Sequence, residues 1–238
     1  MLNAPSLVTH CMQPDLIHLV LFCRRPAAGI GKQRLARSLG KETAAQAARL
    51  LLGAALEDLH DWPGPVVLAP ASAADYEWAT GLLDRPGQVL AQPPGNLGER
   101  LNGIDRSLRA NGAQKILYIG SDSPGLDAPY YAAARQALQN ADVVLGPAAD
   151  GGVTLMGARA AWPDLSGLPW STARLGTALA ELCVLEGWTL ATLDTRHDVD
   201  HETDLHQLAS GLRQDERPAR QALLQWWQAT GAQRGAGT

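Results

Sequence analysis

Short, continuous apolar runs separated by longer mixed segments set the pattern of the chain. Their shortness and their β-branched residues predict strands that are buried on both faces of a sheet. The runs are Leu16–Cys23, Val66–Ala69, Val89–Ala91, Ile116–Ile119 and Val143–Leu145.

The segments between these runs have the three- and four-residue spacing of amphipathic helices. One apolar stripe runs from Ala48 to Leu59 and another from Leu97 to Leu108. Strands that alternate with helices in this way predict a mainly parallel sheet with right-handed crossovers.

The regular alternation of strands and helices stops after Gly146, where the apolar pattern predicts four further elements. They are an antiparallel or edge strand over Val153–Met156, a helix over Thr172–Glu186, a last strand over Trp188–Leu193 and a terminal helix over Arg217–Thr230.

We therefore expect an α/β protein, a three-layer sandwich with a mainly parallel mixed sheet, in a single domain over residues 15–230. The tails, residues 1–14 and 231–238, are expected to be flexible. The Trp226-Trp227 pair in the terminal helix favours packing or an oligomer contact over base stacking, so a homodimer is one candidate assembly.

Composition narrows the class of protein. The chain has 238 residues, 46% hydrophobic and 18% charged, a balance typical of a folded globular protein. Its net charge of −4 gives no general electrostatic reason for nucleic acid to bind. No uncharged apolar stretch approaches the roughly 20 residues of a membrane span, and no secretory leader is recognisable. With three widely spaced cysteines, the sequence predicts a cytoplasmic protein without a membrane partner.

Ligands of open parallel sheets bind beyond the carboxyl ends of the strands, and a basic, glycine-containing loop follows the first run. Its glycines permit close backbone approach, and its cations lie beside a helix start, so we predict a phosphate cradle. It fits neither G-x-G-x-x-G nor Walker A, and a solvated loop is the alternative. The candidate ligands are Arg24, Arg25, Gly29, Gly31, Lys32 and Arg34.

Aspartates follow the later runs. Asp122 comes directly after the fourth run among small residues, where a carboxylate could bind Mg²⁺ or Mn²⁺ and so neutralise a leaving diphosphate. Asp198 or Asp200, after the last predicted strand, could complete the metal site. Asp150 stands before two glycines and is a candidate base. Each of these aspartates could instead cap a turn or a helix.

Six short pieces of sequence, in this order, resemble a known family: the GT-A-fold glycosyltransferase-like proteins of the arsenosugar-biosynthesis type, formerly a domain of unknown function. That family is similar in turn to guanylyltransferases of the phospholactate and molybdenum-cofactor type. The pieces are Arg24–Leu35, Gly95–Arg100, Ile119–Leu126, Gly146–Gly152, Trp170–Thr172 and Asp198–Asp200.

The resemblance implies a nucleotide-diphospho-sugar transferase fold in which Lys32 and Arg34 contact phosphates and Asp122 binds the metal. Arg100 and Ser121, in matched pieces, join the phosphate-binding candidates. The resemblance also implies which residues meet the transferred group and the acceptor: Asp150, Gly151, Gly152, Trp170, Ser171 and Thr172.

Three hypotheses follow for the function. The first is metal-assisted transfer of a sugar from a nucleotide-diphospho-sugar to a small acceptor. The second is nucleotidyl transfer from a nucleoside triphosphate to a phosphorylated small molecule. The third is a protein that binds nucleotide-sugars without catalysis, because the chain departs from the family pattern at Arg24, Gln33, Asn96 and Val153-Thr154.

Overall fold

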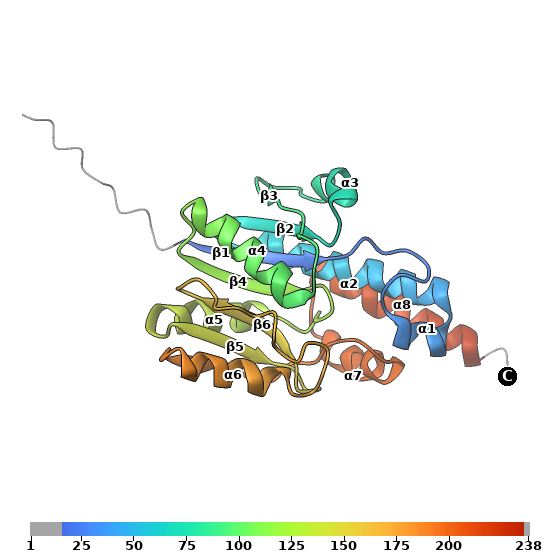
Figure 1. The fold of residues 1–238 in the computed structure, drawn as a ribbon. Helices are drawn as coiled ribbons and strands as arrows, with labels where there is room; N and C mark the ends of the chain where they lie inside the picture. Colours follow the sequence, from blue (N-terminus) through green and yellow to red (C-terminus); the bar gives the residue numbers. More distant parts are fainter. Residues whose placement is uncertain (1–15, 236–238) are drawn as a thin grey trace, which may run out of the picture.

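The computed structural model describes residues 16–235, which fold around one seven-stranded sheet in the order β3-β2-β1-β4-β6-β5-β7 (Figure 1). The predicted α/β class with a mixed, mainly parallel sheet is confirmed. The strands are β1 (Ile17–Cys23), β2 (Val66–Pro70), β3 (Gln88–Val89), β4 (Lys115–Gly120), β5 (Val143–Pro147), β6 (Val153–Ala158) and β7 (Leu190–Thr192).

Strand β6 is the only antiparallel member of this sheet as described for residues 16–235. It pairs with β4 on one side and with β5 on the other, whereas the pairs β1–β2, β1–β4, β2–β3 and β5–β7 are parallel. The predicted antiparallel strand at Val153 is therefore present, and it lies inside the sheet rather than at an edge.

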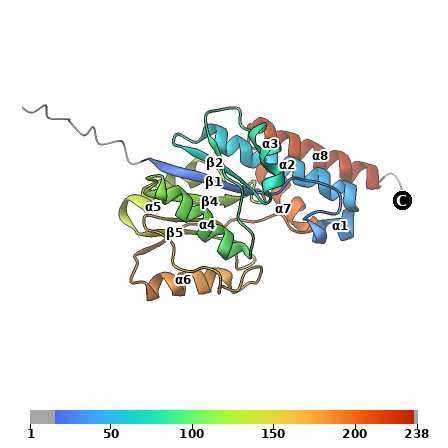
Figure 2. The same cartoon turned by 45° about the horizontal axis from the view of Figure 1, so that its top comes forward.

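Helices cover both faces of the sheet, as the two views of the ribbon show (Figures 1 and 2). Local capping fixes where two of them begin: Asn96 and Glu99 form a reciprocal capping box, and the Asp127 carboxylate accepts a hydrogen bond from the Tyr130 amide at 2.8 Å. The helices are α1 (Gln33–Leu39), α2 (Lys41–Asp61), α3 (Tyr76–Thr80, after a 3-10 turn at Ala73–Asp75), α4 (Leu97–Ala110), α5 (Ala128–Asn140), α6 (Leu175–Leu185), α7 (Glu202–Leu212) and α8 (Pro218–Gly235).

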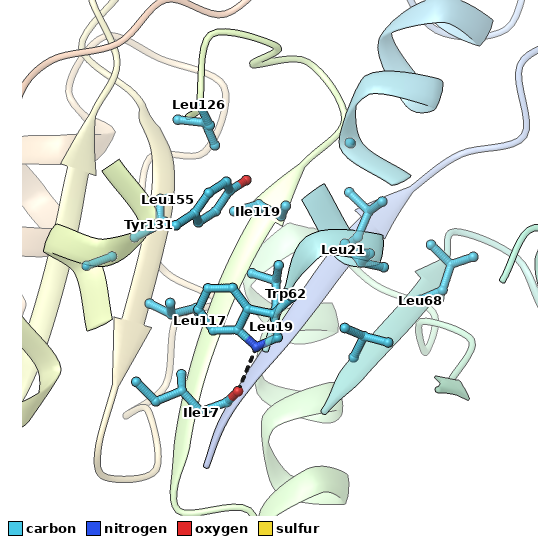
Figure 3. Close-up of a cluster of buried hydrophobic side chains, with 14 of the residues drawn as sticks. Ile17, Leu19, Leu21, Trp62, Leu68, Leu117, Ile119, Leu126, Tyr131 and Leu155 are labelled. Atoms are coloured by element: carbon cyan, nitrogen blue, oxygen red, sulfur yellow. Dashed lines mark hydrogen bonds between the residues drawn. The ribbon is translucent and has the colours of Figure 1, made fainter. Parts of the chain in front are cut away.

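Alternate residues of the central strands bury into two separate cores. Leu19 and Leu117 face a core shared with α2 and α5, and Trp62 closes one end of it by donating its indole N–H to the Ile17 carbonyl at 2.9 Å (Figure 3). Val20 and Ile116 face the opposite core, shared with α4 and α6. This alternation is why the strands appear in the sequence as uninterrupted apolar runs.

A third core lies between α1, α2, α7 and α8. Helix α8 packs beside α2, and the residues Leu51, Leu205 and Trp227 are buried in that core with Leu35 of α1. Because this apolar face anchors α8, the helix continues to Gly235, so residues 231–235 of the predicted flexible tail are helical. The predicted N-terminal tail, residues 1–14, lies outside the described residues, as do residues 236–238.

No helix in the described part of the chain is long and apolar enough to cross a membrane.

Candidate functional site

A cleft of about 350 Å³ opens beyond the carboxyl ends of β1 and β4. Its walls come from the loop after β1, the start of α4 and the turn after β4, which is where ligands of open α/β sheets bind. Among the residues that line it are seven of those predicted from the sequence: Arg24, Arg25, Gly31, Lys32, Arg100, Ser121 and Asp122.

Lys32 joins the first loop to the end of the chain. Its backbone is left-handed, with φ of 45°, immediately before α1 begins. Only 7% of its side chain is exposed, and its ammonium lies 2.9 Å from Asp122 Oδ1 and 3.5 Å from Asp200 Oδ1. The ammonium also donates to the carbonyl of Val199, and the Val199 amide donates to the Asp122 carbonyl at 2.8 Å. Segments distant in sequence are thus fastened together at the cleft.

Two members of the predicted phosphate cradle do not line this cleft. Arg34 is the second residue of α1, and its guanidinium contacts Asp200 Oδ2 at 2.9 Å with about half of the side chain exposed. Gly29 has a positive φ of 77°, and its carbonyl accepts a hydrogen bond from the Gln33 side-chain amide at 2.8 Å. These two residues shape the loop and position Asp200, and their contact with phosphate stays a prediction.

Asp198 is buried near two other aspartates at this end of the sheet. Burial raises the pKa of Asp198 to about 6, and the carboxylates of Asp122 and Asp150 add to the rise. A hydrogen bond from the Ser123 hydroxyl and the charge of Lys32 oppose it. The arrangement therefore concentrates negative charge, which favours a cation at this position.

The aspartates at this end of the sheet can hold a hard divalent cation only if a substrate supplies further oxygen ligands. Within the described residues no group of three or more His, Cys, Asp and Glu side chains is arranged to hold a metal. Magnesium is usually bound by one or two carboxylates with phosphate oxygens and water, so Asp122 and Asp198 suffice as protein ligands. Both oxygens of Asp200 face cations, those of Lys32 and Arg34, which makes Asp200 their ion-pair partner.

The predicted acceptor-side residues divide into two groups. Gly151 is required for packing, because its φ is 88° and a Cβ there would lie 2.2 Å from the Ala173 carbonyl oxygen. Asp150 Oδ1 accepts a hydrogen bond from the Gly152 amide at 2.9 Å, which holds this turn. Trp170 lines a second, smaller pocket beside the cleft, whereas Ser171 and Thr172 are exposed and line neither space.

Sequence reasoning missed the neutral residues of the cleft wall, among them Phe22, Gln92 and Leu97. Gln92 is buried and donates to the Ala69 carbonyl at 2.7 Å, and its position just after a strand run was the available signal. Asn96, which departs from the family pattern, serves as the N-cap of α4. The N-x-x-E spacing with Glu99 could have identified that role.

The sequence matches one protein-family model. A family model described as "Uncharacterized protein conserved in bacteria (DUF2064)" matches residues 51–172. No curated protein matches the sequence significantly.

Solved structures include similar folds. The crystal structure of a proposed nucleotide-diphospho-sugar transferase from Desulfovibrio desulfuricans G20 is 25% identical, with a TM-score of 0.82 over 91% of this chain and 97% of that one. A CMP:2-keto-3-deoxy-manno-octonic acid synthetase in complex with CTP is 11% identical, with a TM-score of 0.52 over 81% and 96%. The bifunctional IspDF of Campylobacter jejuni is 10% identical, with a TM-score of 0.53 over 81% of this chain and 54% of that one.

Proposed function

The chain belongs to the DUF2064 family. From the geometry of the cleft and the similarity to the Desulfovibrio structure we propose that it is a nucleotide-dependent transferase. The reaction we propose is transfer of a sugar from a nucleotide-diphospho-sugar to a small acceptor. One observation carries the proposal: Arg24, Arg25 and Lys32 share a cleft with the strand-end carboxylate of Asp122. The name of the Desulfovibrio relative, with its TM-score of 0.82, supports the same class of substrate.

Each part of the cleft has a role in this proposal. The guanidinium groups of Arg24, Arg25 and Arg100 provide charged donors for the diphosphate oxygens. Lys32 approaches from the side of Asp122, with an ammonium already fixed in direction by its three contacts. Fixed charges of this kind stabilise a departing diphosphate without reorganisation during the reaction.

Asp122 and Asp198 are the residues that would hold Mg²⁺ or Mn²⁺, which when bound neutralises charge on the departing diphosphate. Asp150, on the glycine turn of the same rim, is the proposed base for the acceptor. Its carboxylate has a free oxygen beyond the bond to the Gly152 amide, since only Oδ1 accepts that bond.

Product analysis tests the reaction. The protein is incubated with Mn²⁺ or Mg²⁺, a panel of UDP- and GDP-linked sugars or nucleoside triphosphates, and a small-molecule extract of bacterial cells as the source of acceptors. Release of a nucleoside diphosphate from a nucleotide-sugar is the expected result. Release of diphosphate from a triphosphate would replace sugar transfer by nucleotidyl transfer.

Binding is measured in parallel by thermal shift. Stabilisation by a nucleotide-sugar without turnover under any of these conditions would leave a binding protein in place of an enzyme. If no nucleotide or nucleotide-sugar binds at millimolar concentration with either metal, the proposal is wrong.

A further inference from the structure

A second pocket, of about 150 Å³, lies directly beside the cleft. It is formed between α4, β4 and β6, with Trp170 closing one side. Phe22, Leu97 and Gly120 line both spaces, so the two adjoin, and a ligand that occupies both requires them to be continuous. We refer to this second space as the apolar pocket.

Polar side chains in the walls of the apolar pocket are already bonded within the protein. The Tyr118 hydroxyl donates to Asp105 Oδ1 at 2.8 Å, and the Thr154 hydroxyl donates to the Gly146 carbonyl at 3.2 Å. The Trp170 indole N–H donates to the Leu165 carbonyl at 2.8 Å. The other wall side chains are hydrocarbon or thioether: Phe22, Leu97, Leu101, Val153, Met156 and Leu175. Ile119 and Leu155 also border the pocket, but their side chains belong to the core on the opposite face of the sheet.

These walls select against a polar occupant. A hydroxyl or ring nitrogen that enters the apolar pocket gives up its bonds to water and finds no free side-chain partner, which weakens binding roughly 5- to 150-fold per group. A bare sugar ring carries several hydroxyls, and a nucleobase carries polar edges. Neither chemistry matches the pocket, whereas an apolar group loses nothing by leaving water.

The size of the pocket sets the size of the occupant. An engineered protein cavity of about 150 Å³ lined by Leu, Ile and Phe stays dry and binds benzene. The apolar pocket has the same volume and similar walls. A group of about six carbon atoms therefore fills it.

We propose that the apolar pocket receives an apolar group of about six carbon atoms carried by the acceptor, while the nucleotide phosphates lie in the adjoining cleft. The assignment of the two ligands rests on the proposed function, and the chemistry of the pocket rests on its own walls. The acceptor is accordingly an amphipathic small molecule, with a polar reacting end toward Asp150 and a hydrocarbon end between α4 and β6.

The first test uses benzene, which needs no phosphate site. Its binding to the wild-type protein is followed by ligand-observed NMR and compared with Val153→Phe, which fills the pocket, and with Val184→Phe. Val184 lies on α6 and is 68% exposed, so the second variant adds the same ring outside the pocket. We expect wild type and Val184→Phe to bind benzene and Val153→Phe to lose binding.

A further variant guards against misfolding of Val153→Phe. Val153→Thr keeps the side-chain volume and adds a hydroxyl to the wall, and we expect benzene affinity to fall several-fold while the circular dichroism spectrum stays that of the wild type. Absence of benzene binding to the wild type, or equal binding to the wild type and all three variants, would overturn the proposal that the pocket binds an apolar group.

The second test uses n-alkyl phosphates from methyl to octyl, measured by calorimetry. Affinity is expected to rise roughly fourfold for each added CH₂ up to about six carbons and then to level off. The rise should vanish in Val153→Phe and persist in Val184→Phe. A wild-type affinity independent of chain length contradicts the continuity of the two spaces. Benzene binding without any alkyl phosphate binding would reject the phosphate cleft of the proposed function and leave the pocket standing.

Discussion

Lys32 shows what a single residue can decide at this site. The sequence predicted that Lys32 and Asp122 would converge, because the loop after one parallel strand and the turn after its neighbour meet at one edge. It could not separate Lys32 from Arg34, two cations of the same loop. The left-handed backbone at Lys32 and the start of α1 direct the lysine into the cleft and the arginine toward Asp200.

Replacing Lys32 by methionine tests its role in binding phosphate. The variant removes one charge-assisted hydrogen bond, which is worth about 1.5–3 kcal/mol, so nucleotide-sugar affinity should fall roughly 10- to 150-fold. Lys41→Met is the control, since Lys41 is an exposed lysine of α2 outside the cleft. Calorimetry on both variants provides the measurement, and equal affinities would remove Lys32 from the phosphate site.

Replacing Asp122 by asparagine tests the carboxylate. Its side chain is 46% exposed, so the fold should survive with an unchanged melting temperature to within a few degrees. The Mn²⁺-dependent part of nucleotide affinity should be largely lost, because a neutral amide is a weaker ligand than a carboxylate for a hard cation. Titration with and without Mn²⁺ separates the two contributions. Unchanged metal dependence would exclude Asp122 as a ligand.

The described cysteines should be inert in the native protein. Burial raises the pKa of the Cys23 thiol to about 12 and that of Cys183 to about 11, with Asp75 adding to the rise at Cys23. Because the thiolate is the reacting form, alkylation at pH 8 should be negligible until the protein unfolds. Mass spectrometry after iodoacetamide treatment of a Cys11→Ser variant, with and without urea, measures this. Rapid native labelling of either thiol would contradict it.

At the scale of elements, local sequence signals predicted that a strand or helix exists better than they predicted which elements it packs or pairs with. The strand at Val153 was recognisable from its apolar run, yet its place between β4 and β5 depends on pairing with residues far away in sequence. The sequence predicted a helix start beside the first loop, but the extent of α1 could not be predicted because the helix has only seven residues and little periodicity. The start of α4 was recognisable because its cap is local, in the N-x-x-E spacing from Asn96.

Gly98 tests how closely α4 approaches the loop that carries Trp170. A Cβ at Gly98 would lie 2.1 Å from the Leu165 carbonyl oxygen and 2.7 Å from the Trp170 indole nitrogen. Gly98→Ala should therefore lower the free energy of unfolding by about 1–3 kcal/mol despite the better helix propensity of alanine.

Gly53→Ala is the matched control, in helix α2. A Cβ there meets only the Ala219 side chain at 4.0 Å, an ordinary contact, so this variant should be neutral or stabilised by up to about 1 kcal/mol. Urea unfolding followed by circular dichroism compares the two. Equal effects of both substitutions would show that the backbone approach at Gly98 is not tight.

At the scale of the whole molecule, a buried ionic network ties the C-terminal helix to the rest. The Arg220 guanidinium is fully buried and contacts Asp58 Oδ1 at 2.7 Å, and Arg217 contacts the same oxygen at 2.8 Å. The Tyr131 hydroxyl donates to Asp58 Oδ2 at 3.0 Å. Asp58 thus connects α2, α5 and α8. The sequence suggested none of this, because each partner is a common helix residue and their pairing spans about 160 positions.

Asp58→Ala should be strongly destabilising. It leaves Arg220 buried without its main counter-ion, a loss that costs about 3–5 kcal/mol when one member of a buried pair is removed. Asp84→Ala breaks only an exposed contact with His60, so its unfolding midpoint should barely move. Urea denaturation of both variants is the measurement, and a small effect at Asp58 would mean that water reaches the Arg220 guanidinium.

The contact between Lys32 and Val199 spans 167 positions, and this has a consequence for how the protein is made. Ribosomes add about 5–20 residues per second, so roughly 8–30 s separate the synthesis of Lys32 from that of Val199. For about the second half of that interval Lys32 has Asp122 as a partner, but it lacks Asp200 until the end. A copy that stalls before its final fifth is translated lacks the Val199 carbonyl and Asp200, so it cannot fasten Lys32 as the full chain does.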